Sequence, residues 1–163
     1  MIGVIAVVLH VLTAFWLVAG IIARDVCWWH AARAADLAAL RPIAAIASFF
    51  DRRAVQPGSF VVLVTGLAAT GMRGYKMLAF VRGEGPAWPF AALLIYLSII
   101  PLIAFVFLPK GRVYRAALAE AESRGELTAR LRASIEDPAV VAARGYEFAM
   151  IVVLVYLMVA KPF

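Results

Sequence analysis

The sequence predicts an all-α, polytopic membrane protein: a four-helix transmembrane bundle with amphipathic cytoplasmic connectors. Three observations predict this class. Hydrophobic residues make up 65% of the 163 residues and charged residues only 16%, a composition typical of integral membrane proteins. Four apolar segments approach the roughly 20 residues that a helix needs to cross a bilayer. The sixteen Lys and Arg residues lie almost entirely between those segments.

The first two apolar segments predict helices over residues 2–23 and 57–80. No Lys or Arg precedes the first segment, and it is longer than the apolar part of a secretory signal, so we expect a retained transmembrane helix. The apolar core of the second, "PGSFVVLVTGLAATGM", is short. We therefore expect this helix to continue through "RGYKMLAF", with Arg73 and Lys76 extending toward the membrane interface.

The last two apolar segments predict helices over residues 88–109 and 138–160. Pro101 predicts a kink in the third helix. Asp137 and Pro138 form a favourable N-cap and first-turn pair at the start of the fourth. We expect all four helices to form a single transmembrane domain covering residues 1–163.

The two long connectors have helical patterns of their own. Residues 31–50 predict a short amphipathic helix lying on the membrane. In residues 113–136, Leu127, Leu131 and Ile135 form one apolar stripe, and Gly125 is expected to separate two short helices. Opposite charges stand four residues apart in the pairs Glu120–Arg124, Glu126–Arg130 and Arg132–Glu136. The favoured interpretation is a solvated structural connector.

The basic residues predict the orientation of the chain. Twelve lie in these two connectors and four in the remaining loops, so the connectors are expected on the cytoplasmic side and both termini on the other. No nucleic-acid-binding module accompanies the net charge of +6, so nucleic acid is not an expected partner. The single cysteine, Cys27, excludes an internal disulfide and a multi-cysteine metal site.

One histidine interrupts the apolar stretch "VVLHVLTAFWLVAG" in the first predicted helix. His10 shares a helix face with small or weakly polar neighbours three, four and seven residues away, which let helices approach closely. Intramembrane ionisable groups face the bundle interior, so we expect His10 to point at protein rather than lipid. These neighbours are Gly3, Ala6, Thr13, Leu17 and Gly20.

Counting residues from the helix ends at 1.5 Å each predicts which side chains lie near the depth of His10. Met72, Tyr96 and Met158 are the candidates for a second axial ligand or a hydrogen-bond partner. His30, the other histidine, lies twenty residues further on, which disfavours a bis-histidine heme within one monomer. His10 is thus a structural histidine, a ligand of heme or another cofactor, a proton-transfer group, or a copper ligand.

A second polar feature opens the last predicted helix. Glu147 lies about two turns inside it, and Arg144 stands three residues earlier, so an ion pair could offset part of the cost of burial. The pair is either structural or a carboxylate that anchors a substrate or relays a proton. Trp28 and Trp29, just past the first helix, predict an interfacial aromatic belt.

The stretch "LHVLTAFWLVAG" resembles the first helix of a superfamily of small four-helix bacterial membrane proteins. This HemJ/CopD-like superfamily includes the HemJ-type protoporphyrinogen oxidases, the CopD copper-resistance domain, and a family of predicted integral membrane proteins of unknown function. The "LVTGL" of the second segment and the ending "RGYEFAMIVVLVYLMVAKPF" resemble its second and last helices. The branch of unknown function is the most similar.

The resemblance implies a location in the bacterial inner membrane and a cofactor. In HemJ-like proteins the first-helix histidine is associated with heme b, a role that maps onto His10, and the arginine and glutamate of the last helix map onto Arg144 and Glu147. The oxidases carry a lysine early in the third helix, where this chain has "WPFAALLIY", which argues against that reaction.

The leading hypothesis is a membrane protein that binds heme b through His10 for electron transfer or porphyrin redox chemistry, with Met72, Tyr96 or Met158 opposite. The alternatives are a non-catalytic accessory subunit of a larger membrane complex, and copper transport or tolerance. The partners would be the lipid bilayer and either further copies of the chain or other subunits. Whether the protein is an enzyme stays open.

Overall fold

The computed structural model describes residues 1–162, apart from the side chains of residues 79 and 80, and within that part of the chain it is helical throughout, with no strand. Four helices in it are long and apolar enough to cross a membrane, which confirms the predicted fold class. The helical elements are α1 (Ile2–Ala31), α2 (Leu37–Phe50), η1 (Asp51–Val55), α3 (Gln56–Met72), η2 (Ala79–Arg82), α4 (Trp88–Leu97), α5 (Ile100–Leu102), η3 (Ile103–Phe107), α6 (Leu108–Arg124), α7 (Ala129–Ile135) and α8 (Pro138–Ala160).

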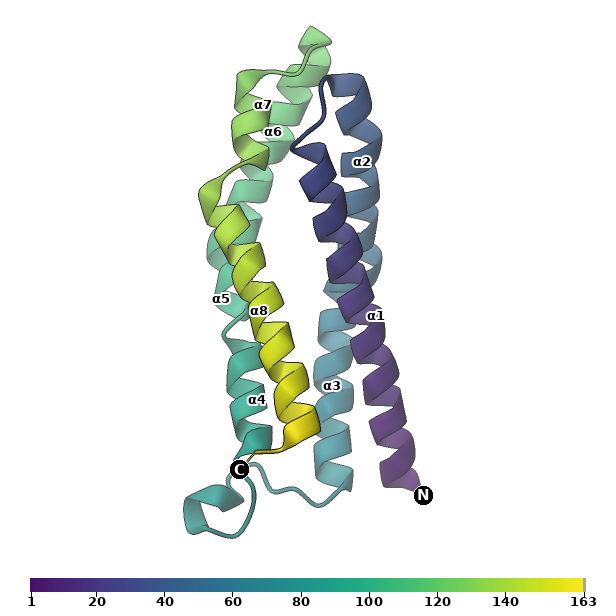
Figure 1. Ribbon diagram of the computed structural model, residues 1–163, viewed down its shortest axis with the longest axis vertical. Coiled ribbons are helices and arrows are strands. Elements are labelled where there is room, and N and C mark those ends of the chain that lie inside the picture. Colours follow the sequence, from purple (N-terminus) through teal and green to yellow (C-terminus); the bar gives the residue numbers. More distant parts are fainter. Residues whose placement is uncertain (163) are drawn as a thin grey trace.

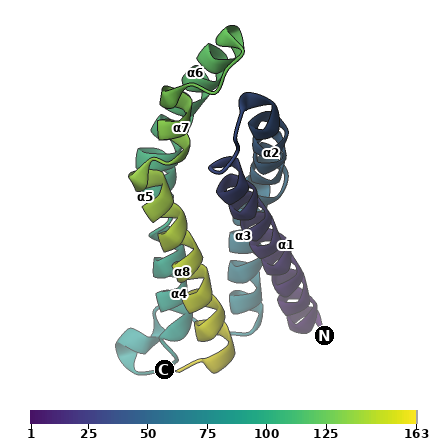
Figure 2. The ribbon, with the colours of Figure 1, turned by 45° about the horizontal axis from the view of Figure 1, so that its top comes forward.

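The helices form two antiparallel hairpins that lie side by side (Figures 1 and 2). In the first, α1 packs against the continuous rod of α2, η1 and α3. In the second, α8 runs beside α4 and η3, and α7 packs on α6. The N-terminus and the end of α8 lie at the same end of the bundle (Figure 1), which we call the terminal end; the opposite end, formed by α2, α6 and α7, is the connector end.

The connector end has a folded apolar core. Helix α1 has 30 residues, about 45 Å at 1.5 Å per residue, which exceeds the roughly 30 Å of a hydrocarbon core. The helix predicted within residues 31–50 is confirmed by α2, but its expected position flat on the membrane is corrected, because α2 continues into α3 and buries its apolar face against α6 and α7. The buried residues of this connector cluster are Ala34, Leu37, Leu40, Ala44, Ala117, Ala121, Leu131 and Ile135.

The predicted details of the second connector are partly confirmed. Gly125 ends α6 in the left-handed conformation, at φ 69°, and thereby separates α6 from α7. Glu120 pairs with Arg124 at 2.9 Å. The Glu126–Arg130 prediction was wrong, because Arg130 reaches back to Glu120 at 3.0 Å instead.

Two predicted helix boundaries also change. The second membrane helix ends at Met72 and not at residue 80. Gly74 then adopts φ 78°, and "RGYKMLAF" forms turns that lead into the short helix η2. The third helix is broken by a turn at residues 98–99, just before Pro101, and continues to Arg124. The fourth begins at Pro138 as expected, with the Asp137 carboxylate accepting a hydrogen bond from the backbone N–H of Ala139 at 3.0 Å.

Proline explains where the two π-helical turns lie. The turn η1 ends at Val55, two residues before Pro57, and η3 ends at Phe107, two residues before Pro109. A proline inside a helix donates no N–H and clashes with the carbonyl four residues earlier. A π turn adds one residue to the helical turn, which makes room for the proline ring and for the carbonyl that has lost its donor. Both long rods therefore cross the membrane without breaking at these prolines.

The outward faces of the hairpins are apolar. Phe15, Phe60, Phe105 and Val159 each expose more than two thirds of their surface. In water this would form an apolar surface far larger than soluble monomers expose. In a bilayer these side chains contact acyl chains, so the little apolar surface that the protein buries is concentrated between α1 and α3 and in the connector cluster.

Candidate functional site

A cavity of about 930 Å³ lies between the two hairpins. Its volume falls at the upper end of the range of small-molecule pockets. The middle of its wall is apolar, with side chains from all four long helical segments. The side chains there include Leu17, Ile21, Leu63, Ile100, Ile103, Ile151 and Leu154.

His10 lines this cavity from α1. Its Nδ1 lies 3.3 Å from Oγ1 of Thr65 on α3, and Thr65 Oγ1 is also 3.0 Å from Thr13 Oγ1. The ring is half-buried and faces protein, which confirms the expected orientation. A threonine hydroxyl that contacts Nδ1 fixes the orientation of the ring, as a neighbouring group does for most ligating histidines.

Glycine lets the imidazole approach the backbone of α3. A Cβ added to Gly66 would lie 2.9 Å from Cε1 and 3.3 Å from Nδ1 of His10, closer than any real side chain tolerates at Cε1. The same small-residue contact recurs along α1, where Gly3 faces the carbonyl of Met72 and Gly20 faces Ala54. These pairs define the antiparallel register of α1 and α3, in which His10 stands opposite Thr65 and Gly66.

The register separates Met72 from His10. Met72 lies opposite Gly3, seven residues along α1 from His10, or about 10 Å. Its side chain is 57% exposed, and it is not among the residues that line the cavity. The predicted common depth was wrong for Met72, because that estimate counted α3 from residue 57 as an isolated helix, whereas the rod starts at Leu37.

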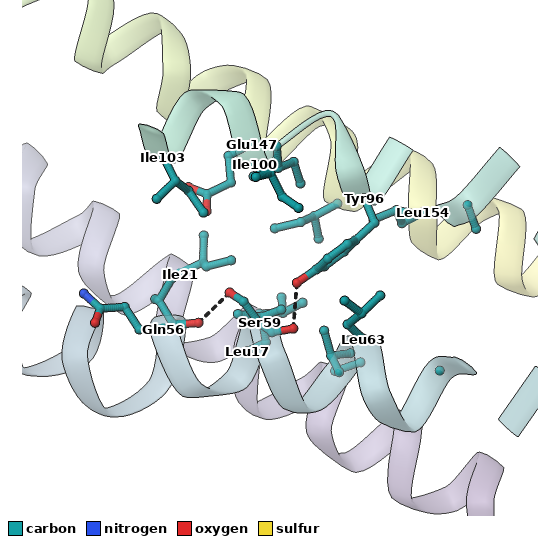
Figure 3. A pocket seen from close by; sticks show the side chains of 18 of the residues that line it. Leu17, Ile21, Gln56, Ser59, Leu63, Tyr96, Ile100, Ile103, Glu147 and Leu154 are labelled. Atoms are coloured by element: carbon teal, nitrogen blue, oxygen red, sulfur yellow. Dashed lines mark hydrogen bonds between the residues drawn. The ribbon is translucent and has the colours of Figure 1, made fainter. Parts of the chain in front are cut away.

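Tyr96 and Met158 both line the cavity. The hydroxyl of Tyr96 crosses from α4 to α3 and donates a hydrogen bond to the backbone carbonyl of Ser59 at 2.6 Å (Figure 3). Ser59 precedes Thr65 by six residues, so this hydroxyl lies about 9 Å from the level of His10. Met158, near the end of α8, lies on the wall toward the terminal end.

Glu147 takes a partner that the sequence did not indicate. Its Oε2 accepts a hydrogen bond from Nη2 of Arg24 at 2.5 Å, and the two side chains are only 8% and 7% exposed. The predicted Arg144–Glu147 ion pair was wrong, since no contact within 4.0 Å joins them among the described residues. Arg24 lies on the facing hairpin, so it neutralises Glu147 across the junction. It also contacts Asp25 at 2.9 Å and Asp51 at 3.7 Å.

Arg144 lies on the same wall without a strong partner. Its Nε is 4.0 Å from Asp25 Oδ1, at the limit of an ion pair, and this atom is buried without a hydrogen bond. Its guanidinium lies over the ring of Trp28, 4.9 Å from the centroid, and Trp28 contacts Tyr114 edge-on at 5.1 Å. Trp28 therefore faces the junction between the hairpins and not lipid alone, which corrects the aromatic-belt prediction for it; Trp29 stays 54% exposed.

The two ends of the cavity thus differ in chemistry. At the terminal end the lining includes His10, Arg73, Met158 and Lys161. At the connector end it includes the basic residues Arg24, Arg52, Lys110, Arg115 and Arg144 and the acidic residues Asp51 and Glu147. His10 and Arg24 are fourteen residues apart on α1, about 21 Å, so the ends are separate sites.

Sequence reasoning missed Thr65, Ser59 and the role of Arg24. Thr65 was the central residue of the quoted "LVTGL", and aligning the α1 glycines with α3 would have placed it opposite His10. Arg24 had been counted only among the basic residues that set orientation. No group of three or more His, Cys, Asp or Glu side chains that could hold a metal ion occurs in the described part of the chain.

The chain belongs to a family described as "Predicted integral membrane protein (DUF2269)", which matches residues 4–162. The match covers all four long helices and both connectors. No curated protein and no solved structure matches the chain. The broader HemJ/CopD-like resemblance stays a prediction, and Phe163 of its quoted ending lies outside the described residues.

Proposed function

We propose that this integral membrane protein binds heme b in the cavity between its hairpins, with His10 as an axial ligand. The observation that carries the proposal is the position of the His10 imidazole and its contacts. Its Nδ1 contacts Thr65 Oγ1 at 3.3 Å, its ring lies against Gly66, and it lines a cavity of about 930 Å³. This arrangement leaves Nε2 as the nitrogen that would bind iron.

The residues present at the terminal end fit a porphyrin. The apolar cavity wall suits the macrocycle, and Arg73 at the end of α3 and Lys161 at the end of α8 both line the cavity, where they would supply positive charge for the two propionates. Met158, which also lines the cavity, would be the candidate for a second ligand of the iron. When bound, heme would supply one-electron redox chemistry, whose potential depends on axial ligands and on solvent exclusion.

The proposal is tested by the absorption spectrum of the detergent-purified protein, oxidised and reduced, after expression with a heme precursor. We expect a Soret band that His10→Ala abolishes and that His30→Ala leaves unchanged. His30 is the matched control because it is the other histidine and is exposed at the end of α1. A Soret band of unaltered intensity and position in His10→Ala contradicts the proposal, as does the absence of any band in the wild-type protein.

In the same experiment, the variant Thr65→Val tests whether Thr65 orients His10. This substitution removes the hydroxyl that contacts Nδ1 and keeps the shape of the side chain. If Thr65 orients the ligand, the band persists but the reduction potential of the bound heme changes, because a hydrogen bond at Nδ1 alters ligand basicity. An identical potential in both proteins would contradict the assigned role of Thr65 without touching that of His10.

The same preparation tests the alternatives from the sequence. Metal analysis that finds stoichiometric copper without a Soret band would favour copper transport, and constant co-purification of other subunits without cofactor would favour an accessory role.

We also propose the inner membrane of a bacterium as the location, with both termini on the non-cytoplasmic side, on the evidence of the basic connectors. In a chain whose Cys27 is replaced by serine, labelling of a single cysteine placed at Ile2 or at the exposed connector residue Arg124 tests the orientation.

A further inference from the structure

The arginine-lined connector end of the cavity has no role in heme binding, because it lies about 21 Å along α1 from His10. Five basic and two acidic side chains line it. Arg24 is saturated by its three carboxylate contacts. Arg52 and Arg115 have no acidic partner among the described residues. Lys110 pairs with Asp137 at 2.7 Å, so the excess positive charge of this end comes from Arg52 and Arg115 and from Arg144, whose nearest carboxylate, on Asp25, is 4.0 Å away.

Arg144 is the most informative of these side chains. It lies at the junction of the hairpins with its Nε buried and without a hydrogen bond, a condition that costs free energy unless a ligand relieves it. The side chain is 20% exposed and lines the cavity. The indole ring of Trp28 holds the guanidinium in place from one face. An anion in the cavity would complete its hydrogen bonding.

The position of these arginines relative to the membrane indicates which kind of anion would bind them. Arg24 directly follows the apolar residues 2–23, so this level is a membrane–water interface, where phospholipid headgroups lie. On the bilayer side the wall becomes apolar, with Leu17, Ile21 and Ile151 packed together. A phosphate next to the arginines and a hydrocarbon chain along this wall would match both parts.

We propose that the connector end of the cavity binds an anionic phospholipid. Its phosphate lies among Arg52, Arg115 and Arg144, and its acyl chains extend between the hairpins past Ile21. Basic pockets between transmembrane helices are recognised sites for anionic headgroups, and arginine binds phosphate oxygens through paired hydrogen bonds. The site does not depend on heme, so its test stands apart from that of His10.

The test measures lipid binding to the full-length protein in detergent by native mass spectrometry. The lipids are phosphatidylglycerol and phosphatidylcholine with identical acyl chains, and inorganic phosphate is a third probe. We expect one saturable phosphatidylglycerol per chain, bound about tenfold more tightly than phosphatidylcholine, and no comparable binding of inorganic phosphate. Arg144→Gln should weaken phosphatidylglycerol binding about tenfold, in keeping with the loss of one charge-assisted contact.

Arg124→Gln is the matched control, because Arg124 is exposed and pairs with Glu120 away from the cavity; it should bind lipid as the wild type does. Should Arg144→Gln fail to fold, as judged by circular dichroism, Arg115→Gln replaces it, since Arg115 is exposed and lines the cavity mouth. Equal binding of the two lipids, or wild-type binding by the folded cavity variants, overturns the proposal. Inorganic phosphate binding as tightly as phosphatidylglycerol overturns its lipid part.

Discussion

The contact between α1 and α3 and the junction between the two hairpins are built in opposite ways. Within the first hairpin, Gly3, Gly20, Gly58 and Gly66 bring the backbone of α1 close to the rod of η1 and α3. Between the hairpins, α1 and α8 meet at few positions. There the hairpins are joined by the Arg24–Glu147 ion pair, the Tyr96–Ser59 hydrogen bond and the connector cluster, and at the connector end also by Arg132, which donates to the carbonyls of Ala32 and Ala34, and by the Arg41–Glu122 ion pair.

The difference shows how the protein both holds its helices together in the membrane and leaves a cavity between them. Lipid tails are as apolar as leucine, so helices associate through close van der Waals contact or through polar interactions. The glycine-rich contact uses the first route. The junction uses the second, and widely spaced polar contacts hold the hairpins while leaving a cavity open. The chain therefore has one hairpin joined by close backbone contact and, around the cavity, a junction joined by fewer contacts.

Of the substitutions at the junction, Glu147→Ala should lower the free energy of unfolding the most. Glu147→Ala leaves Arg24 buried without its partner across the hairpins, and loss of one member of a buried pair costs about 3–5 kcal/mol. Asp25 still contacts Arg24, so we expect a loss of about 3 kcal/mol in the free energy of unfolding. Denaturant titration in detergent micelles, followed by circular dichroism, measures it.

Glu126→Ala provides the comparison for Glu147→Ala. Glu126 is exposed on the connector and forms no ion pair among the described residues, so its removal should change stability by less than about 0.5 kcal/mol. Replacing both Arg24 and Glu147 by leucine should recover part of the loss, because well-packed apolar residues often match a buried pair. A loss below about 1 kcal/mol in Glu147→Ala would show that the pair does not hold the hairpins together.

Adding a methyl group at Gly20 should disturb the glycine-rich contact next most strongly. The new Cβ would lie 2.5 Å from Cβ of Ala54 in η1, so the backbones of α1 and the η1–α3 rod must move apart. Overpacking of this kind costs about 1–3 kcal/mol. Gly145→Ala is the opposite case, because nothing lies within 4 Å of that Cβ and alanine favours a helix by about 0.5–1 kcal/mol. Equal effects in the two variants would contradict the close approach of α1 and α3.

The sequence predicted what composition and helical period determine. The four membrane helices, the Asp137 N-cap, the break at Gly125 and the inward orientation of His10 all follow from local residue patterns, and the structure confirms each. The orientation of His10 was predictable because its small neighbours share its helix face. Boundaries were less accurate, since α1 and the α2–α3 rod extend past the bilayer into a core that the apolar runs do not reveal.

The candidate site was predictable only in part, because pairing across helices depends on register. Counting from helix ends placed Met72 beside His10, whereas the glycine contacts place Thr65 there. Glu147 was expected to pair within its own helix, yet Arg24, 123 residues away, reaches it from the other hairpin. Sequence spacing favours local partners, and a buried carboxylate instead takes the cation that tertiary packing brings to it.

Tyr96→Phe should have the smallest effect and tests a second polar contact across the junction. The variant keeps the ring and removes the hydroxyl that donates to the Ser59 carbonyl at 2.6 Å. That carbonyl lies within a helix and keeps its backbone partner, so the loss should fall near the lower end of the usual 0.5–1.5 kcal/mol. Tyr146→Phe is the matched control, because its hydroxyl contacts Ser98 Oγ at 2.7 Å within the second hairpin.

Amide hydrogen exchange tests whether the Tyr96 contact also holds the cavity wall in place. If it does, Tyr96→Phe but not Tyr146→Phe should increase the exchange rate of backbone amides in α4 near the cavity. Equal exchange in both variants would mean that the cavity wall does not depend on this contact, leaving the ion pair and the connector cluster to hold the hairpins.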